Sequence, residues 1–359
     1  MKIFKSFALV CLGVFSINSV QARPIFNIFL PTYYITESTI EDFKKACNCD
    51  VALNFFGDPQ EMAAKIAAGA SGYDVIISTG YAIQDLYRMG KFEKIDLSRI
   101  KNLENIDPKY LNQEFDPKNE YSIPYAYTPV LLGYNKVELD RLKIIPNSWA
   151  VLFDEKYLKL LKGRVTVLDS PRNVFGAALI YLGKDPNSQD MDDIAAARKL
   201  IASVSKYWVR YDSTNFHRAL LSGEIWLAMS YSSDLFNAIV EDKKLKPNLR
   251  KNLSGMMAKE GGLIELDNVV IPKAAKNKDL AYVFINTILK AENAYSLGVQ
   301  TGSSIPNVKA FKLLPKEIVE NPWIYPRPEQ KVYGFLAYQP KTRIMVNEIW
   351  TELKMVCTY

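Results

Sequence analysis

The first hundred residues alternate short apolar runs with amphipathic stretches. The runs are almost continuously apolar, which is typical of strands covered on both faces. The predicted strands are 24–30, 50–56 and 74–78, and the predicted helices are 37–46, 60–68 and one that starts at about Gly80. Strands that alternate with helices at this spacing predict an α/β fold, with a parallel sheet flanked by helices.

A segment containing Pro and Asn, 95–121, interrupts this rhythm before a long strand at 122–135. That strand begins with polar and aromatic residues and ends in an apolar run, which suits a crossing between two domains. The rhythm then restarts, with predicted strands at 164–168, 207–210 and 224–230 and predicted helices at 171–182, 192–203, 217–222, 234–240, 279–290, 291–300 and 342–354.

The stretch 260–272 combines two glycines, a short apolar strand that carries Asp267, and a closing Pro272. Glycine favours a turn before the strand, and proline ends it. We expect the chain to re-enter its first domain here and to place Asp267 in a cleft. Asp267 could instead be a turn residue bonded to its own backbone.

Residues 1–22 have the pattern of a secretory signal peptide. Lys2 and Lys5 precede the apolar run 7–17, and small residues follow near Ala22. A membrane anchor is the alternative, but this run is too short to span a bilayer. Cys11 lies inside the run, after a residue larger than a lipoprotein cleavage site prefers. We therefore expect an exported protein.

The chain of 359 residues is 48% hydrophobic, which is enough for two cores. Loss of the signal peptide would lower the formal charge from +6 to +4, because Lys2 and Lys5 leave with it. The remaining basic residues are scattered among acids rather than gathered on a stripe, so we expect no nucleic-acid partner.

Three cysteines would remain after cleavage: Cys47, Cys49 and Cys357. A bond between Cys47 and Cys49 would close a very small ring, so we expect one of them to pair with Cys357, with free thiols as the alternative. A metal site at Cys47 and Cys49 would lack ligands, because His217 is the only histidine.

Hydroxyl and tyrosine side chains cluster where the predicted strands end. The segments are 32–34, 78–81, 169–173, 230–234 and 265–267. Open α/β sheets bind ligands at the carboxyl ends of their strands. This composition favours reversible capture of a small polar molecule. We expect no enzyme, no cofactor and no metal, because the chain lacks a phosphate-binding glycine loop, a second histidine and a Gly-x-Ser-x-Gly motif.

Several runs resemble the periplasmic spermidine/putrescine-binding proteins of ABC importers. They are 72–79, 119–125, 259–278 and 302–307, and the likeness extends over about 25–355. It implies a two-lobe periplasmic binding protein, monomeric, that closes on a small-molecule ligand and docks on an inner-membrane permease. The expected lobes are 23–133 with 259–305, and 134–258 with 306–359.

Carried over by position, the resemblance preserves only part of the ligand site. Matching positions are Thr32, Tyr34, Ser78 and Asp267. Positions where the family's acidic or aromatic residues are replaced are Tyr33, Gly80, Ser170, Asn173, Tyr231, Glu265 and Ser303. Asp267 is thus expected to be the single surviving carboxylate, with Glu265 facing solvent.

One cationic head could lie between Asp267 and tyrosine faces, while Arg172 and the helix N-termini near Ser170 and Ser78 would favour an anion. We therefore expect a small cationic or zwitterionic ligand: a polyamine, a monoamine or a choline-type compound. The candidate binding residues are Thr32, Tyr33, Tyr34, Ser78, Thr79, Tyr81, Ser170, Arg172, Asn173, Tyr231, Asp267 and Ser303.

Each candidate also has a simpler interpretation. Tyr33, Tyr34 and Tyr81 could be core aromatics, and Arg172 could tie the lobes together. Ser170 and Asp234 could each start a helix, and His217 could be an exposed helical residue. A ferric-ion carrier that uses Tyr33, Tyr34, Tyr81 and Tyr231 is the alternative function.

Overall fold

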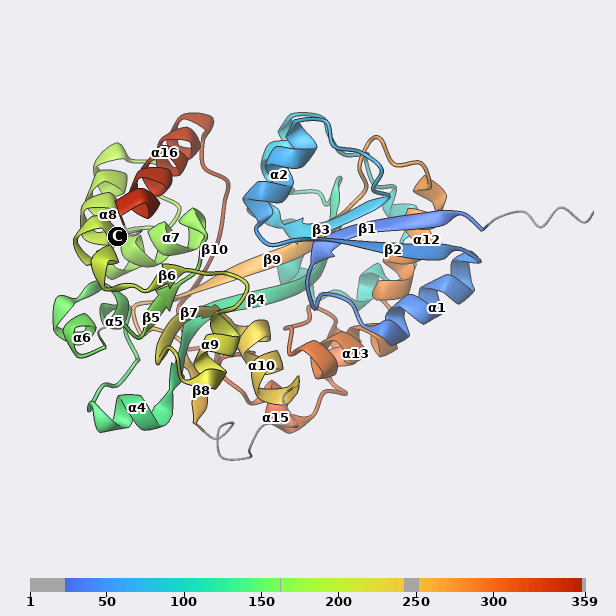
Figure 1. Ribbon diagram of the computed structural model, residues 1–359. Coiled ribbons are helices and arrows are strands. Elements are labelled where there is room, and N and C mark those ends of the chain that lie inside the picture. The colour runs from blue at the N-terminus through green and yellow to red at the C-terminus, as the bar shows by residue number, and fades with distance from the viewer. Residues whose placement is uncertain (1–22, 162, 242–251, 357–359) are drawn as a thin grey trace, which may run out of the picture.

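The computed structural model describes residues 23–161, 163–241 and 252–356 (Figure 1). The signal peptide predicted at 1–22 and Cys357 lie outside the described residues. Within the described ranges, no helix is both long and apolar enough to cross a membrane.

The described strands form one mixed sheet. Its order is β2-β1-β3-β9-β4-β7-β5-β6, with β8 beside β4 and β10 beside β9. β1 runs parallel to β2 and β3, whereas β9 is antiparallel to β3 and β4. The strands are β1 (Ile25–Pro31), β2 (Asp50–Phe56), β3 (Val75–Thr79), β4 (Ser122–Asn135), β5 (Val165–Val167), β6 (Arg210–Tyr211), β7 (Leu227–Tyr231), β8 (Leu253–Met256), β9 (Gly262–Val270) and β10 (Val332–Gly334).

Helices flank this sheet, as predicted for an α/β fold. They are α1 (Glu37–Cys47), α2 (Pro59–Ala67), α3 (Gly80–Arg88), α4 (Lys136–Arg141), α5 (Ala150–Phe153), α6 (Glu155–Leu160), α7 (Pro171–Tyr181), α8 (Met191–Val204), α9 (Phe216–Ser222), α10 (Ser232–Glu241), α12 (Lys278–Ile288), α13 (Ala291–Thr301), α14 (Val308–Phe311), α15 (Lys316–Val319) and α16 (Pro340–Val356). The long predicted elements are confirmed to within a few residues.

The differences concern short elements. The strand predicted at 207–210 is a 3-10 turn over Ser205–Tyr207 followed by β6. The strands β8 and β10 and the helices α4, α5, α6, α14 and α15 were not predicted. Each has only three to six residues, too few to show a clear periodicity.

β4 and β9 connect the two ends of the sheet (Figure 1). β4 pairs with β9 from Ser122 to Val130 and with β7 from Val130 to Tyr134. Farther along the chain, the side chain of Gln84 accepts a hydrogen bond from the backbone of Ala337, and Arg343 pairs with Asp85. The helices around β1 to β3 are thus joined to those around β5 to β7 at several places.

The described core consists of two apolar clusters. In one cluster, Phe26 of β1 packs against Phe43 of α1 and Phe284 of α12. On the other face of β1, Phe29 contacts Phe56 at 5.0 Å between ring centroids and belongs to a cluster that extends through α7 and α8. Strand alternation therefore gives β1 a role in both clusters.

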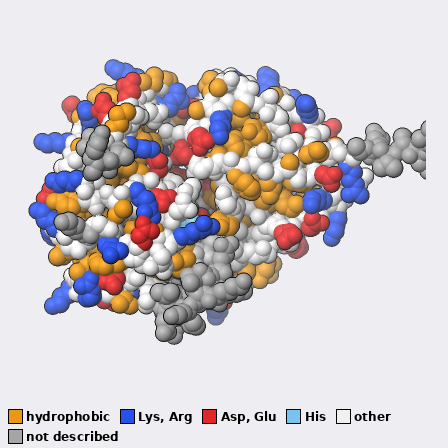
Figure 2. All heavy atoms as spheres, viewed as in Figure 1, with side chains coloured by type: hydrophobic (Ala, Val, Ile, Leu, Met, Phe, Trp, Pro, Cys, Tyr) orange, Lys and Arg blue, Asp and Glu red, His pale blue; other side chains and the backbone are white. Residues whose placement is uncertain are grey.

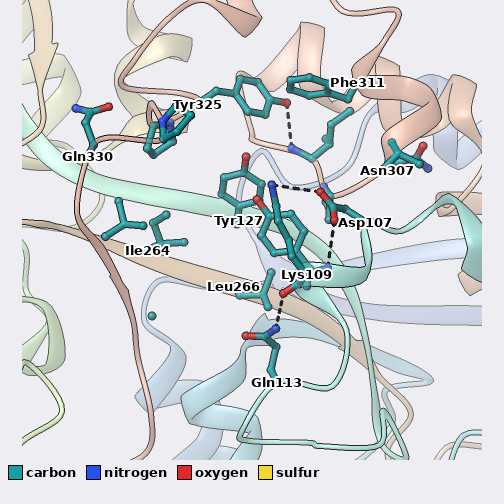
Figure 3. A pocket seen from close by; sticks show the side chains of 18 of the residues that line it. Asp107, Lys109, Gln113, Tyr127, Ile264, Leu266, Asn307, Phe311, Tyr325 and Gln330 are labelled. Atoms are coloured by element: carbon teal, nitrogen blue, oxygen red, sulfur yellow. Dashed lines mark hydrogen bonds and ion pairs between the residues drawn. The ribbon is translucent and has the colours of Figure 1, made fainter.

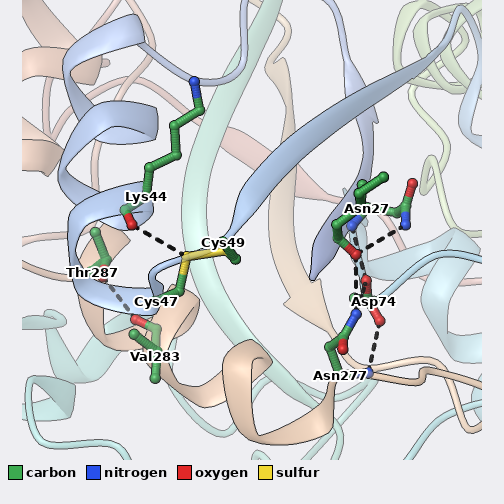
Figure 4. The surroundings of a disulfide bond; sticks show 9 residues. Asn27, Lys44, Cys47, Cys49, Asp74, Asn277, Val283 and Thr287 are labelled. Carbon is green, nitrogen blue, oxygen red and sulfur yellow. Dashed lines mark hydrogen bonds between the residues drawn. A yellow bond between two sulfur atoms is a disulfide. The ribbon is translucent and has the colours of Figure 1, made fainter. Parts of the chain in front are cut away.

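A disulfide links Cys47 and Cys49 at the junction of α1 and β2 (Figure 4). The expected bond to Cys357 is therefore wrong. Asn48 between them takes a left-handed conformation, with φ of 48°, and caps α1. This local turn brings the two Cα atoms to 5.1 Å, so the small ring closes without a distant partner.

The outer edge of the sheet is partly apolar. β2 is the edge strand, and the side chains of Leu53 and Phe55 are 38% and 52% exposed. Ile25 of β1 is also exposed, and Figure 2 shows apolar side chains gathered over this part of the surface. These residues belong to neither cluster of the core.

Candidate ligand-binding site

A cavity of about 200 Å³ lies where β1, β3 and β7 end, beside one face of β9. We call it the acidic cleft. Its lining residues are Pro31, Thr32, Tyr33, Tyr34, Phe56, Gly57, Pro59, Ser78, Thr79, Thr128, Ser213, Thr214, Asn215, His217, Arg218, Tyr231, Ser233, Asp234, Glu265 and Asp267. Most of them come from strand ends and the segments that follow, but Thr128, Glu265 and Asp267 lie within β4 and β9, and His217 and Arg218 lie in α9.

β9 separates this cleft from a second, larger cavity. Glu265 and Asp267 line the acidic cleft, whereas Ile264 and Leu266 line a groove of about 1290 Å³ on the other face of the strand. Figure 3 shows this aromatic groove, where Tyr127 lies close to Tyr325. The two-residue period of a strand accounts for the division.

The smaller cavity is the better candidate for a ligand site. The acidic and basic side chains of the aromatic groove lie near the surface, as in the pair between Lys109 and Asp107 at 3.2 Å. The acidic cleft instead contains buried carboxyl groups with perturbed pKa values, a feature that marks functional sites more often than size does.

Asp267 is fixed by hydroxyl groups. The Tyr34 hydroxyl donates to Oδ2 of Asp267 at 2.5 Å, and the Thr128 hydroxyl lies 2.5 Å from the same Tyr34 oxygen. Asp267 is only 3% exposed, and this burial raises its pKa to about 7. The expectation that Asp267 faces a cleft agrees with this geometry.

Glu265 also faces the cleft, and the expectation that it faces solvent is wrong. Its side chain is 5% exposed and accepts a hydrogen bond from Nδ2 of Asn173 at 2.7 Å. Burial, and secondarily the charge of Asp267, raises the pKa of Glu265 to about 8. The alternation of β9 would have revealed this residue, because a strand that turns residue 267 inward turns residue 265 the same way.

Asp234 provides a third carboxyl group. It lies in the first turn of α10 and lines the cleft, where burial raises its pKa to about 7. The expected single carboxylate at Asp267 is therefore also wrong. Asp234 lies in one of the strand-end segments expected near the ligand, 230–234, but is not among the predicted binding residues. It does not start the helix, because α10 begins two residues earlier, at Ser232.

The cleft has little positive charge to balance these acids. Among the described residues, the basic ones that line it are Arg218, which is exposed, and His217. His217 is half-buried rather than exposed as expected, and burial lowers its pKa. Among the described residues, no ion pair involves Asp234, Glu265 or Asp267. Buried acids of this kind suit a cationic ligand, because its charge stabilises their ionised form.

Seven of the twelve predicted residues line the cleft, and five do not. Lining residues are Thr32, Tyr33, Tyr34, Ser78, Thr79, Tyr231 and Asp267. Tyr33 has a positive φ of 62°, which is uncommon for a residue with a Cβ atom. The local turn after β1 thus directs Tyr33 and Tyr34 toward the cleft.

The other predicted residues lie in the surrounding layer. Asn173 donates to the hydroxyl of Tyr231 at 3.1 Å and to that of Ser170 at 3.1 Å. The hydroxyl of Ser303 lies 2.8 Å from that of Thr301, and the ring of Tyr81 packs against Phe335. Tyr81, Ser170, Asn173 and Ser303 are buried but do not line the cleft.

Arg172 is enclosed away from the cleft. It is 1% exposed and donates to the carbonyl oxygens of Pro186 and Leu336, at 2.8 and 3.1 Å. Its guanidinium also lies over the rings of Phe335 and Tyr338. With these partners, Arg172 joins α7 to the segment after β10 and is not available to an anionic ligand.

The architecture defines a class of protein. A solved structure described as a putative spermidine/putrescine ABC transporter from Listeria monocytogenes superposes with a TM-score of 0.84 at 28% identity, covering 92% of this chain and 99% of that one. The fold is that of periplasmic binding proteins, which confirms the expected fold class.

Sequence comparison narrows the class to a family. A model of the bacterial extracellular solute-binding proteins matches residues 38–325. The putrescine/cadaverine-binding protein of Pseudomonas aeruginosa is 37% identical over 97% of this chain and 99% of its own length. The spermidine/putrescine-binding periplasmic protein of Escherichia coli is 30% identical over 83% of this chain and 82% of its own length.

The chain therefore belongs to the bacterial extracellular solute-binding proteins, among the relatives of the spermidine/putrescine-binding periplasmic proteins. This membership confirms the resemblance read from the sequence. It also confirms the expectation of a transport protein rather than an enzyme.

Proposed function

We propose that this protein is the periplasmic solute-binding component of an ABC importer and that it captures a short polyamine in the acidic cleft. The observation that carries the proposal is the set of three carboxyl groups, Asp234, Glu265 and Asp267, on one cavity, none of them paired with a cation among the described residues. An ammonium group would supply the missing charge.

A diammonium ligand suits the cleft better than a zwitterion or a choline-type phosphodiester. Arg172 and Asn173, which could have held an anion, are bonded to protein groups. The cleft volume of about 200 Å³ lies below the range of about 300–1,000 Å³ typical of drug-sized ligands. Putrescine or cadaverine therefore fits this proposal better than the longer spermidine.

The tyrosines of the cleft support an amine rather than a ferric ion. Tyrosinate ligands require loss of the phenolic proton, but burial and the nearby acids raise the pKa of Tyr34 and Tyr231 well above the usual value. Neutral rings can still pack on an ammonium group. The Tyr34 hydroxyl already donates its hydrogen bond to Asp267.

Capture by closure of two lobes belongs to the proposal. The lobes are 23–133 with 259–305, and 134–258 with 306–359, and the pairing of β4 with both β9 and β7 supports a hinge between them. The buried Ile318 and Ile324 pack in the cluster of α1 and α12, which favours a second boundary nearer to residue 326. We propose that the closed monomer docks on an inner-membrane permease.

Calorimetric titration of the purified protein with putrescine, cadaverine and spermidine tests the function. We expect Asp267→Asn to weaken diamine binding by roughly 30-fold or more, because it removes a buried counter-charge. Asp107→Asn in the aromatic groove is the matched control and should leave the affinity unchanged. Absence of amine binding, or full affinity in Asp267→Asn, would contradict the proposal.

A further inference from the structure

Two carboxyl groups lie along one face of β9, two residues apart. Asp267 and Glu265 both line the acidic cleft. Residues at this spacing on a strand are separated by about 7 Å between Cα atoms. Their partners come from different parts of the fold: Tyr34 and Thr128 beside Asp267, and Asn173 of α7 beside Glu265. The two carboxyl groups therefore form distinct ends of one site.

The hydrogen bonds around Glu265 leave acceptor capacity unused. Nδ2 of Asn173 lies 2.7 Å from Oε1 of Glu265, and 3.1 Å from each hydroxyl oxygen of Tyr231 and Ser170. An amide nitrogen carries two hydrogens for these three acceptors. Among the described residues, no other side chain donates to the Glu265 carboxyl group.

A further unpaired acceptor lies beside Glu265. The Oδ1 atom of Asn173 is buried without a hydrogen-bond partner among the described residues. An ammonium group has three hydrogens to donate and no acceptor. A bound ammonium would therefore satisfy the carboxylate, whose single protein donor leaves it incompletely paired.

We infer that Glu265 binds the second ammonium group of a diammonium ligand and so makes the protein select diamines over monoamines. This inference rests on the proposed function and adds the residue that determines specificity. Asp267 would hold the first ammonium group, and the alkyl chain would lie along β9 between the two carboxylates. A monoamine of equal length would leave Glu265 without a counter-charge.

Burial of Glu265 explains why this discrimination is strong. A buried carboxylate without a counter-charge is costly. The raised pKa of Glu265 reflects that cost, and desolvation is its main cause. The second ammonium stabilises the ionised form of Glu265 and gains an ion pair, whereas the methyl end of a monoamine leaves Glu265 protonated and gains none.

The test compares cadaverine with n-pentylamine by calorimetry, in the wild-type protein and in Glu265→Gln. Glutamine keeps the size of the side chain and an oxygen that can accept from Asn173. We expect Glu265→Gln to weaken cadaverine binding by about tenfold or more and to leave n-pentylamine binding nearly unchanged. Glu329→Gln, an exposed site outside the cleft, is the control for net charge.

Equal losses for both amines, or no loss for cadaverine, would overturn the inference while leaving the proposed function intact. A wild-type protein that binds neither amine would overturn the proposed function itself. Glu265→Asp gives an independent measurement, because the shorter side chain withdraws the carboxylate from the cleft. It should shift the preference toward a longer diamine, and an unchanged order of affinities would count against the assignment.

Discussion

At the scale of single residues, the carboxyl groups of the acidic cleft favour ligand binding at the expense of the stability of the unliganded fold. Asp267 and Glu265 are almost fully buried, yet their carboxyl groups have few protein partners. Such groups favour the neutral form, as their raised pKa values indicate. The unliganded site is therefore ready for a cation but contributes little to the stability of the fold.

The affinity for a diamine should rise between pH 6 and pH 8. Because the pKa values of Asp234 and Asp267 are about 7 and that of Glu265 about 8, these groups are largely protonated at pH 6. A diammonium ligand must then displace protons, and each proton released can change the affinity by up to about tenfold per pH unit. The amine itself stays charged over this range.

Calorimetry in buffers of different ionisation enthalpy would count the released protons. Glu265 is influenced by the charges of Asp267 of β9, Asp58 after β2 and Arg172 of α7, and by the hydrogen bond from Asn173 of α7. The charge of Glu265 in turn contributes to the raised pKa of Tyr81 in α3 and of Tyr231 in β7. The hydrogen bond from Asn173 and, to a smaller extent, the charge of Arg172 oppose the rise in the pKa of Glu265. A binding constant independent of pH would contradict the prediction.

At the scale of elements, Arg172 ties α7 to the segment after β10. Replacement by methionine would leave the carbonyl oxygens of Pro186 and Leu336 without their donor. We expect Arg172→Met to lower the free energy of unfolding by about 2–4 kcal/mol. Arg198→Met is a suitable control, because Arg198 forms only an exposed pair with Glu352.

Chemical denaturation monitored by circular dichroism would measure both variants. The Arg198→Met change should stay within about 1 kcal/mol. If the two variants are equally stable, Arg172 does not hold α7 and the later segment together.

The elements that sequence predicts well are those with a long local pattern. The run at 260–272 predicts β9 and the inward position of Asp267 because its apolar residues and flanking turns are adjacent in the chain. The hydrogen bond between Asn173 and Glu265 joins residues 92 positions apart, so it cannot be predicted from a local sequence pattern. Arg172 likewise depends on Leu336, 164 positions away.

The predicted cysteine pairing is wrong for a different reason. The small ring favours a bond to Cys357 over one between Cys47 and Cys49, but the left-handed turn at Asn48 brings these two together. Charged side chains in strands usually face water, which favours an outward Glu265, but its two-residue spacing from Asp267 places both on the same face. In both cases, local backbone geometry decided against a general rule.

At the scale of the whole molecule, ligand capture should be accompanied by compaction. β4 and β9 connect the two parts of the fold (Figure 1) and line the proposed site. A diamine that contacts residues from both parts, such as Tyr34 and Tyr231, favours the closed arrangement.

Small-angle X-ray scattering would detect this closure. The radius of gyration should decrease on addition of saturating diamine, toward the value of about 20 Å expected for a compact chain of this length. Asp267→Asn should show no decrease at the same ligand concentration. An unchanged radius in the wild-type protein would mean that the protein binds without lobe movement.

The two faces of β9 also limit how this protein can evolve. Glu265 and Asp267 line one cavity, and Ile264 and Leu266 line the other. A single inserted or deleted residue in this strand would exchange the faces, placing the acids in the aromatic groove and the aliphatic chains in the cleft. New ligand preferences can therefore arise through replacement of residue 265 or 267. An insertion or deletion within β9 would instead disrupt both cavities.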